Sequence, residues 1–290
     1  YVNRFFQKLR EEGKIILLGR ANRARYIFAT SDSIKKAKKD ITKIHRILQN
    51  QNIFEDVIYN EIKRDTEILT GLKKNISNIL YYAFTEMLNN AIEHSQSKII
   101  KVNMEKIDKW IRFDVVDEGV GIFNNITKKK GLHNIMEAIQ DLLKGKLSTI
   151  PEAHSGEGIF FTSKAADTFI IQSSKKKIIF NNLLEEIFIK DIIKEVAGTK
   201  VSFSIELDSK KDLKDIFKKY TDEALEFSKT EVTVKLYKID TEYISRSQAR
   251  RVLSGLDKFK TIMLDFKDIN TIGQGFSDEV FRVWKHLYPE

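Results

Sequence analysis

The segment TEMLNNAIEHS, from Thr85 to Ser95, constrains the fold of this chain more than any other segment. Its apolar residues recur at helical spacing, so we expect an amphipathic helix. Glu86 and Asn90 are four residues apart, which puts both side chains on one face of that helix. A carboxylate beside a carboxamide can orient a nucleophile and hold a hydrated Mg²⁺ at one phosphate. Taken alone, the segment fits equally well a surface helix that carries a polar pair.

Two glycine-containing turns follow this helix in the sequence. Asp117, Gly119 and Gly121 form a D-x-G-x-G pattern after a predicted strand, and Gly156 and Gly158 precede a predicted helix. Glycine lets backbone N–H groups approach a phosphate closely, and a helix N-terminus adds positive potential. A lone Gly-x-Gly is usually only a turn, whereas the order of these three segments is far more specific.

In this order the segments resemble the N box, G1 box and G2 box of the GHKL ATP-binding fold. Gyrase B subunits, mismatch-repair ATPases, histidine kinases and anti-sigma-factor serine kinases share that fold. The resemblance covers roughly residues 65–207 and implies an α+β fold, the Bergerat α/β sandwich with a mixed antiparallel sheet.

The resemblance also implies ATP and Mg²⁺ as ligands and assigns a role to each residue of the motifs. Asn90 would ligate Mg²⁺, Asp117 would accept a hydrogen bond from the adenine amino group, and Glu86 stands where hydrolytic and serine-kinase members carry a general base. The pocket residues would be Gly119, Gly121, Gly156, Gly158 and Thr199, the last of which follows Gly198 and would touch adenine, often through water.

Composition excludes several classes of site. The chain has no cysteine, which rules out disulfides, thiol nucleophiles and cysteine–metal sites, and its five histidines show no paired ligand spacing, so we expect no zinc. No apolar run approaches the ~20 residues that span a bilayer, and no signal-peptide pattern is present. We therefore expect a cytoplasmic protein without a membrane partner.

Positive charge is concentrated at the N-terminus. Residues 1–50 hold 13 Lys and Arg against 4 Asp and Glu, a net charge of +9 that equals the net charge of the whole chain. A basic module on a neutral body is typical of a nucleic-acid-binding head, and a solvated basic helix is the alternative.

The first 30 residues resemble the last part of a winged helix-turn-helix domain. A predicted helix ends at Gly13, and a predicted hairpin with its turn at residues 19–23 follows. By that resemblance DNA would be contacted from the helix by Asn3, Arg4 and Lys8, and from the wing by Arg20, Arg23 and Arg25. The alternative is a basic segment that packs on its own ATPase domain.

The C-terminal part is predicted to form a βαβα unit that resembles STAS-like domains of anti-anti-sigma factors. Phosphorylated STAS domains carry Asp-Ser-Ser-Gly before a helix, whereas this chain has Gly273-Gln274-Gly275-Phe276, so a phosphorylation switch here is in doubt. Ser277 is expected to be a helix N-cap, and the glycine turn is either a docking site or ordinary strand-to-helix packing.

We expect four parts along the chain: residues 1–32, the end of a winged helix; residues 33–64, a helical linker; residues 65–208, the GHKL domain; and residues 209–290, the STAS-like domain. The segment between the two glycine turns would be the lid over the triphosphate, where Lys128–Lys130 either meet phosphate charge or lie in a solvated loop. The chain is also a candidate for homodimerisation.

Three functions remain open at this point. The first is a bacterial DNA-binding transcriptional regulator whose GHKL domain binds, and slowly hydrolyses, ATP·Mg²⁺. The second is an anti-sigma-type serine/threonine kinase that acts on a STAS or sigma-factor partner, and the third is a scaffold that only binds nucleotide.

Overall fold

The computed structural model describes residues 2–18, 25–33, 42–144, 158–220, 231–236, 243–254, 256–257, 261–267 and 269–288. The chain divides into two compact units. One comprises Tyr1–Ile122 and Thr162–Leu213, and the other comprises Phe123–Phe161 and Lys214–Glu290.

A five-stranded sheet is the centre of the first unit, with the strand order β3-β4-β5-β7-β6 and every neighbouring pair antiparallel. Its strands are β3 (Lys43–Gln49), β4 (Ile99–Ile107), β5 (Trp110–Asp117), β6 (Thr168–Asn181) and β7 (Glu186–Glu206). Alternate side chains of β4 and β5 are buried, as the sequence alternation predicts.

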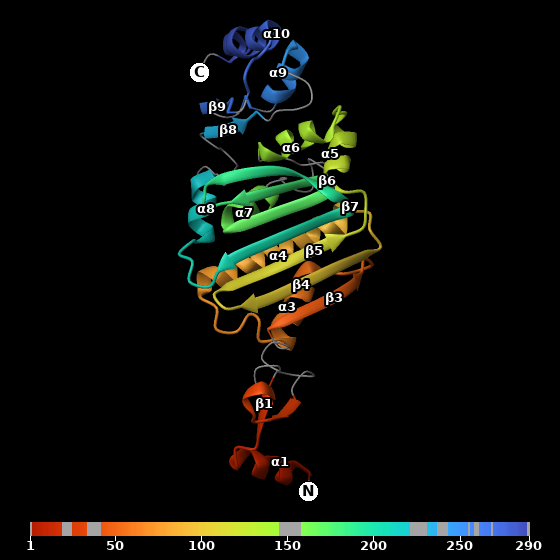
Figure 1. Cartoon of the computed structure of the whole chain (residues 1–290), viewed down its shortest axis with the longest axis vertical. Coiled ribbons are helices and arrows are strands. Elements are labelled where there is room, and N and C mark those ends of the chain that lie inside the picture. Colours follow the sequence, from red (N-terminus) through yellow and green to blue (C-terminus); the bar gives the residue numbers. More distant parts are fainter. Residues whose placement is uncertain are drawn as a thin grey trace. The chain divides into compact units, whose positions relative to one another are not determined.

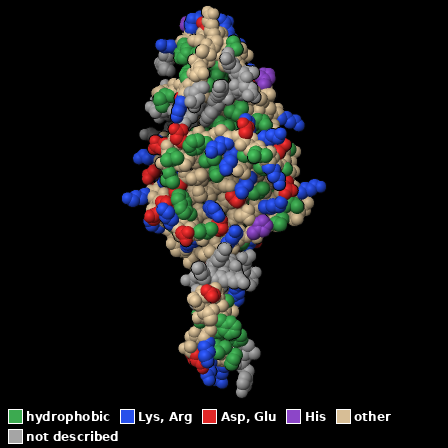
Figure 2. All heavy atoms as spheres, viewed as in Figure 1, with side chains coloured by type: hydrophobic (Ala, Val, Ile, Leu, Met, Phe, Trp, Pro, Cys, Tyr) green, Lys and Arg blue, Asp and Glu red, His purple; other side chains and the backbone are tan. Residues whose placement is uncertain are grey.

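Helices α3 (Glu55–Asp65) and α4 (Lys74–His94) lie on one face of this sheet (Figure 1). The apolar side of α4 is buried against the strands, and its Phe84 ring meets Phe113 of β5 edge-to-face at 5.5 Å. Phe113 in turn stacks on Phe203 of β7 at 5.0 Å. The opposite sheet face carries charged side chains of both signs among scattered hydrophobic ones (Figure 2), for example the 3.1 Å ion pair of Lys200 with Asp114. The predicted α/β sandwich is therefore confirmed.

The edge strand β3 corrects our prediction of a helical linker over residues 33–64. Helix is right for α3 and wrong for Lys43–Gln49, which pairs with β4. Ile44 is buried while His45 and Ile47 are exposed, which is the period-two alternation of a strand. Residues 34–41 lie outside the described residues.

The strands after residue 167 also differ from the prediction. The sequence there predicts four strands, DTFIIQSS, KKIIFNN, EEIFIKD and TKVSFSIEL. The structure has two long strands, β6 and β7, whose pairing shifts register between Ser173 and Lys176. Ser174 has φ +54° at this irregularity. Each long strand thus joins two predicted segments across a bulge.

The N-terminal residues form α1 (Val2–Glu11) and an antiparallel hairpin of β1 (Ile15–Leu18) and β2 (Arg25–Phe28). Gly13, with φ +67°, ends the helix as predicted, and Phe6 stacks on Tyr26 at 4.7 Å. The predicted turn at residues 19–23 lies outside the described residues.

The second unit begins within α5 (Ile122–Lys130) and continues with α6 (Ile135–Leu143); α7 (Gly158–Ala165) leads back to the first unit. After α8 (Leu213–Tyr220) come β8 (Glu231–Lys235), α9 (Arg246–Leu253) and β9 (Thr261–Asp265). A final helical stretch comprises α10 (Gln274–Asp278), the π-helix η2 (Glu279–Trp284) and α11 (Lys285–Leu287). Strands β8 and β9 are parallel, which confirms the predicted βαβα order.

The turn before α10 packs tightly on the chain. A Cβ added to Gly273 would lie 2.6 Å from the Cα of Ile244, so the glycine allows ordinary close packing here. Gly273 is itself the N-cap, and Ser277 lies inside the helix, so the predicted N-cap role of Ser277 is wrong.

Candidate nucleotide site

Helix α4 presents the Glu86–Asn90 pair beside its buried stripe. Met87, Leu88 and Ala91 are buried, whereas Glu86 and Asn90 are both half-buried. Because the helix packs its apolar side on the sheet, the pair stays at the boundary between the core and solvent.

The carboxyl group of Asp117 is held at the end of β5. The side chain is 4% exposed, and its Oδ1 accepts hydrogen bonds from the N–H groups of Gly119 (2.9 Å) and Thr199 (3.2 Å). Burial raises the pKa of Asp117 above its ordinary value, although these two hydrogen bonds act to lower it. The result is a buried acceptor with a fixed orientation.

Two glycines permit this arrangement. A Cβ on Gly119 would lie 1.8 Å from the backbone oxygen of Ser95, just beyond the end of α4. Gly198 has φ +71°, and a Cβ there would lie 2.3 Å from the oxygen and 2.6 Å from Oδ1 of Asp117. No other residue type fits at either position, so the ends of α4 and β5 and the Gly198-Thr199 pair come together.

Thr199 connects this cluster to the start of α5. Its Oγ1 accepts a hydrogen bond from the N–H of Ile122 at 2.9 Å. The neighbouring carbonyl of Gly198 accepts one from Ser173 Oγ at 2.7 Å. Sequence reasoning missed both Ser95 and Ser173: Ser95 acts through its backbone, and no motif marks Ser173.

The fold and this cluster agree with the comparisons to known families. Residues 62–180 match the family model described as histidine kinase-like ATPase domain. The chain carries a GHKL-type ATPase domain. Residues 248–290 match a STAS-like domain of unknown function (DUF4325), and the chain matches no curated protein. An ATPase domain of this type followed by a STAS-like domain fits an ATP-binding regulator.

A GHKL-type domain implies nucleotide binding, usually together with Mg²⁺. The described residues include no cluster of three or more His, Cys, Asp or Glu side chains that could hold a metal. Magnesium at nucleotide sites takes only one or two protein ligands, with water and phosphate supplying the rest, so a carboxamide such as Asn90 suits it.

The structure describes two of the three remaining residues that were predicted to line the pocket. Gly121 is buried with φ +77° and directly precedes α5, and Gly158 is the first residue of α7. Gly156 lies outside the described residues. The structure thus brings the GHKL residues Asp117, Gly119 and Thr199 into contact, and the role of each stays a prediction.

The predicted DNA-binding residues lie outside both family matches. Arg4 and Lys8 are exposed on α1, and Arg25 is exposed on β2. The side chain of Asn3 is not described, and Arg20 and Arg23 lie outside the described residues. Among the described helices, none combines the length and apolar character needed to cross a bilayer.

Proposed function

We propose that this chain is a regulator that binds ATP·Mg²⁺ between the Glu86–Asn90 face of α4 and the Asp117 turn. One observation carries the proposal: Asp117 is buried with Oδ1 engaged by two backbone N–H groups. A carboxylate has about four lone-pair sites, so acceptor capacity remains for an exocyclic amine such as that of adenine.

The other residues take complementary roles in this proposal. Asn90 would hold Mg²⁺, which neutralises phosphate charge when it is bound. Glu86 would orient the attacking hydroxyl of water or of a protein serine. Gly119, Gly121, Gly156, Gly158 and Thr199 would shape the pocket.

Isothermal titration calorimetry on the whole chain tests the proposal. We expect Mg²⁺-dependent binding of ATP and weaker binding of GTP, because guanine presents a carbonyl where adenine presents an amine. Asn90→Ala should remove the Mg²⁺ dependence, while Asn60→Ala, an exposed asparagine on α3, should leave it intact. Folded protein that gives no heat with ATP would overturn the proposal.

Two finer functions extend this regulator. The N-terminal charge and the exposed Arg4, Lys8 and Arg25 support DNA binding, in which ATP would alter the affinity for DNA. The STAS-like match supports the alternative, a serine/threonine kinase acting on a separate STAS partner. Incubation with labelled ATP and a STAS partner, scored for phosphoserine, separates the kinase from the regulator.

A further inference from the structure

The segment between the two glycine turns belongs structurally to the STAS-like unit. Phe123–Phe161 forms one compact unit with Lys214–Glu290, although the ATPase sequence flanks it on both sides. Helix α6 contacts α9 and β8 in this unit. It buries Ala138, Ile139 and Leu142, and α9 buries Val252 and Leu253. The predicted ATP lid is thus packed on the tail.

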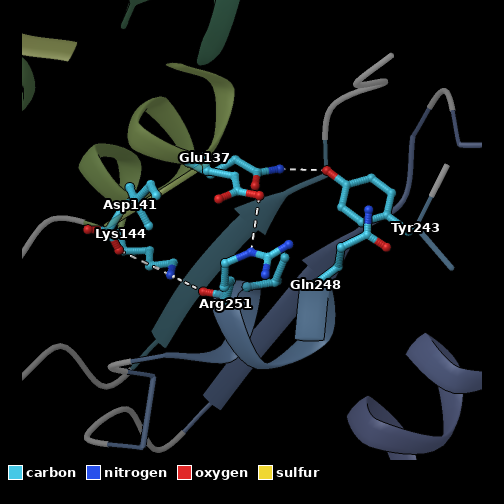
Figure 3. A pocket seen from close by; sticks show the side chains of 9 residues that line it. Glu137, Asp141, Lys144, Tyr243, Gln248 and Arg251 are labelled. Atoms are coloured by element: carbon cyan, nitrogen blue, oxygen red, sulfur yellow. Dashed lines mark hydrogen bonds and ion pairs between the residues drawn. The ribbon is translucent and has the colours of Figure 1, made fainter. Parts of the chain in front are cut away.

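Buried polar contacts fix α6 in this position (Figure 3). Gln140 Nε2 donates to the hydroxyl of Tyr243 at 2.5 Å, and both side chains are at most 5% exposed. Glu137 Oε1 lies 3.1 Å from Arg251 Nε. Because the Gln140–Tyr243 pair is withdrawn from water, losing one partner of it costs more than it would at the surface, whereas Glu137 and Arg251 are partly exposed.

Lys144, directly after α6, binds the C-terminal end of α9. Its Nζ donates to the carbonyls of Arg251 (2.8 Å) and Ser254 (3.2 Å). The last carbonyls of a helix lack intrahelical partners and attract cations, so Lys144 caps α9. We call Gln140, Lys144 and Glu137, with their partners on the tail, the lid latch.

The lid contains lysines whose positive charge could bind the phosphates of a nucleotide, and two of these lysines are paired in the structure. The Lys144 side chain is 8% exposed and also pairs with Asp141 at 3.2 Å. Lys130, at the end of α5, pairs with the same carboxylate at 2.6 Å. Asp141 is thus shared by two lid cations, and docking of α6 adds the carbonyl contacts that hold Lys144 on the tail.

We propose that the STAS-like domain restrains the ATP lid through the lid latch, and that nucleotide binding and latch opening favour one another. This inference rests on the proposed binding of ATP. If the docked lid withholds Lys144 from phosphate, weakening the latch raises the population competent to bind and hence the apparent affinity. By linkage, bound nucleotide loosens the latch by the same factor.

Two latch variants and two matched controls test this on the whole chain. Tyr243→Phe removes one hydroxyl without changing shape, and Lys144→Met removes the buried cation. Tyr288→Phe and Lys285→Met change an exposed tyrosine and an exposed lysine of the same unit. Hydrogen–deuterium exchange of residues 135–143 reports docking without nucleotide, and calorimetry reports ATP·Mg²⁺ affinity.

We expect Tyr243→Phe to speed exchange in α6 and raise ATP affinity by about 2- to 10-fold, the worth of one hydrogen bond. Lys144→Met should also speed exchange in α6, but it removes the cation that an undocked lid would offer to phosphate, so the coupling is judged on Tyr243→Phe. Exchange equal to the controls in both variants would overturn the latch, and faster exchange in Tyr243→Phe with unchanged or weaker ATP affinity would overturn the coupling. No ATP binding by any of the proteins would instead overturn the proposed function, and the exchange data would still decide the latch.

Discussion

Two opposing effects act on the carboxyl group of Asp117. Burial raises its pKa, and the hydrogen bonds from Gly119 and Thr199 lower it by less. A carboxyl whose pKa is higher in the folded state binds protons more readily there. Its contribution to folding stability is therefore lost as pH rises from the ordinary aspartate pKa of about 3.9 through the raised value. A carboxylate kept at such a site fits a role in recognition better than a role in stability.

Asp117→Asn separates these two roles. The amide oxygen can accept the same N–H groups, so we expect the fold to persist and the pH dependence of the unfolding free energy just above pH ~3.9 to shrink. The amide N–H would face the adenine amine, so ATP affinity should fall by about 10- to 150-fold. Urea unfolding at several pH values and calorimetry measure both, with Asp114→Asn on the opposite sheet face as the control. Unchanged ATP affinity would remove Asp117 from the site.

A second prediction at the residue scale concerns the catalytic role of Glu86. If Glu86 orients the attacking hydroxyl, Glu86→Gln should lower ATP turnover or phosphotransfer by about 10²- to 10⁴-fold while binding persists. Glu93→Gln, an exposed carboxylate later on α4, is the matched control. Steady-state phosphate release measures turnover, and a variant as fast as the unmodified chain would exclude Glu86 as the base.

At the scale of elements, Arg46 ties the edge strand β3 to α3. Its guanidinium lies 2.9 Å from Asp65 Oδ2 and also bonds Glu61, and the side chains of Arg46 and Asp65 are only 17% and 10% exposed. Arg46→Met leaves the nearly buried Asp65 carboxylate with only the exposed Arg64 as its cation, so we expect a loss of up to about 3 kcal/mol of unfolding free energy. Arg112→Met, whose side chain is 60% exposed, should cost no more than about 1 kcal/mol. Equal losses in urea unfolding would show that β3 is not held by this pair.

The same strand shows why sequence patterns identified some elements and missed others. Strands β4 and β5 could be predicted because their side chains alternate between the two sheet faces over nine and eight residues. In KIHRILQ, Ile44, Ile47 and Leu48 also match helical spacing, and only pairing with β4, distant in sequence, decides for a strand. Likewise no local signal reveals that α6 packs on α9, because each helix alone shows only an amphipathic side.

The residues of the candidate site could be predicted where a motif specifies the side chain. They could not be predicted where only the backbone makes the contact. Asp117, Gly119 and Thr199 were found because they stand in the motifs, and at Gly119 a Cβ would collide with the backbone oxygen of Ser95. Ser95 offers its carbonyl to Val120 N–H, which any residue could do. Ser173 reaches Gly198 only because β6 and β7 lose regular pairing just beyond it.

At the scale of the whole molecule, the distribution of charge and the packing of the chain draw different boundaries along the sequence. The excess charge lies within residues 1–50, while the predicted lid is packed with the tail. A nucleotide bound between the glycine turns would contact the very segments from which the lid emerges. The lid latch would then relay nucleotide occupancy to the STAS-like domain.

DNA binding by that head predicts a specific dependence on salt. Each phosphate contact releases counterions, so a plot of log affinity against log salt should be steep and linear for duplex DNA. Arg4→Gln and Lys8→Gln should each weaken binding to all sequences alike and reduce the slope by about 1, whereas the exposed Lys285→Gln should leave the slope unchanged. If ATP is coupled to the head, ATP·Mg²⁺ should change the affinity by about 5- to 150-fold at fixed salt. Fluorescence anisotropy of a labelled duplex at several salt concentrations measures all three. Slopes that are shallow, or equal in all variants, would mean that the N-terminal charge is a solvated surface and not a DNA-binding one.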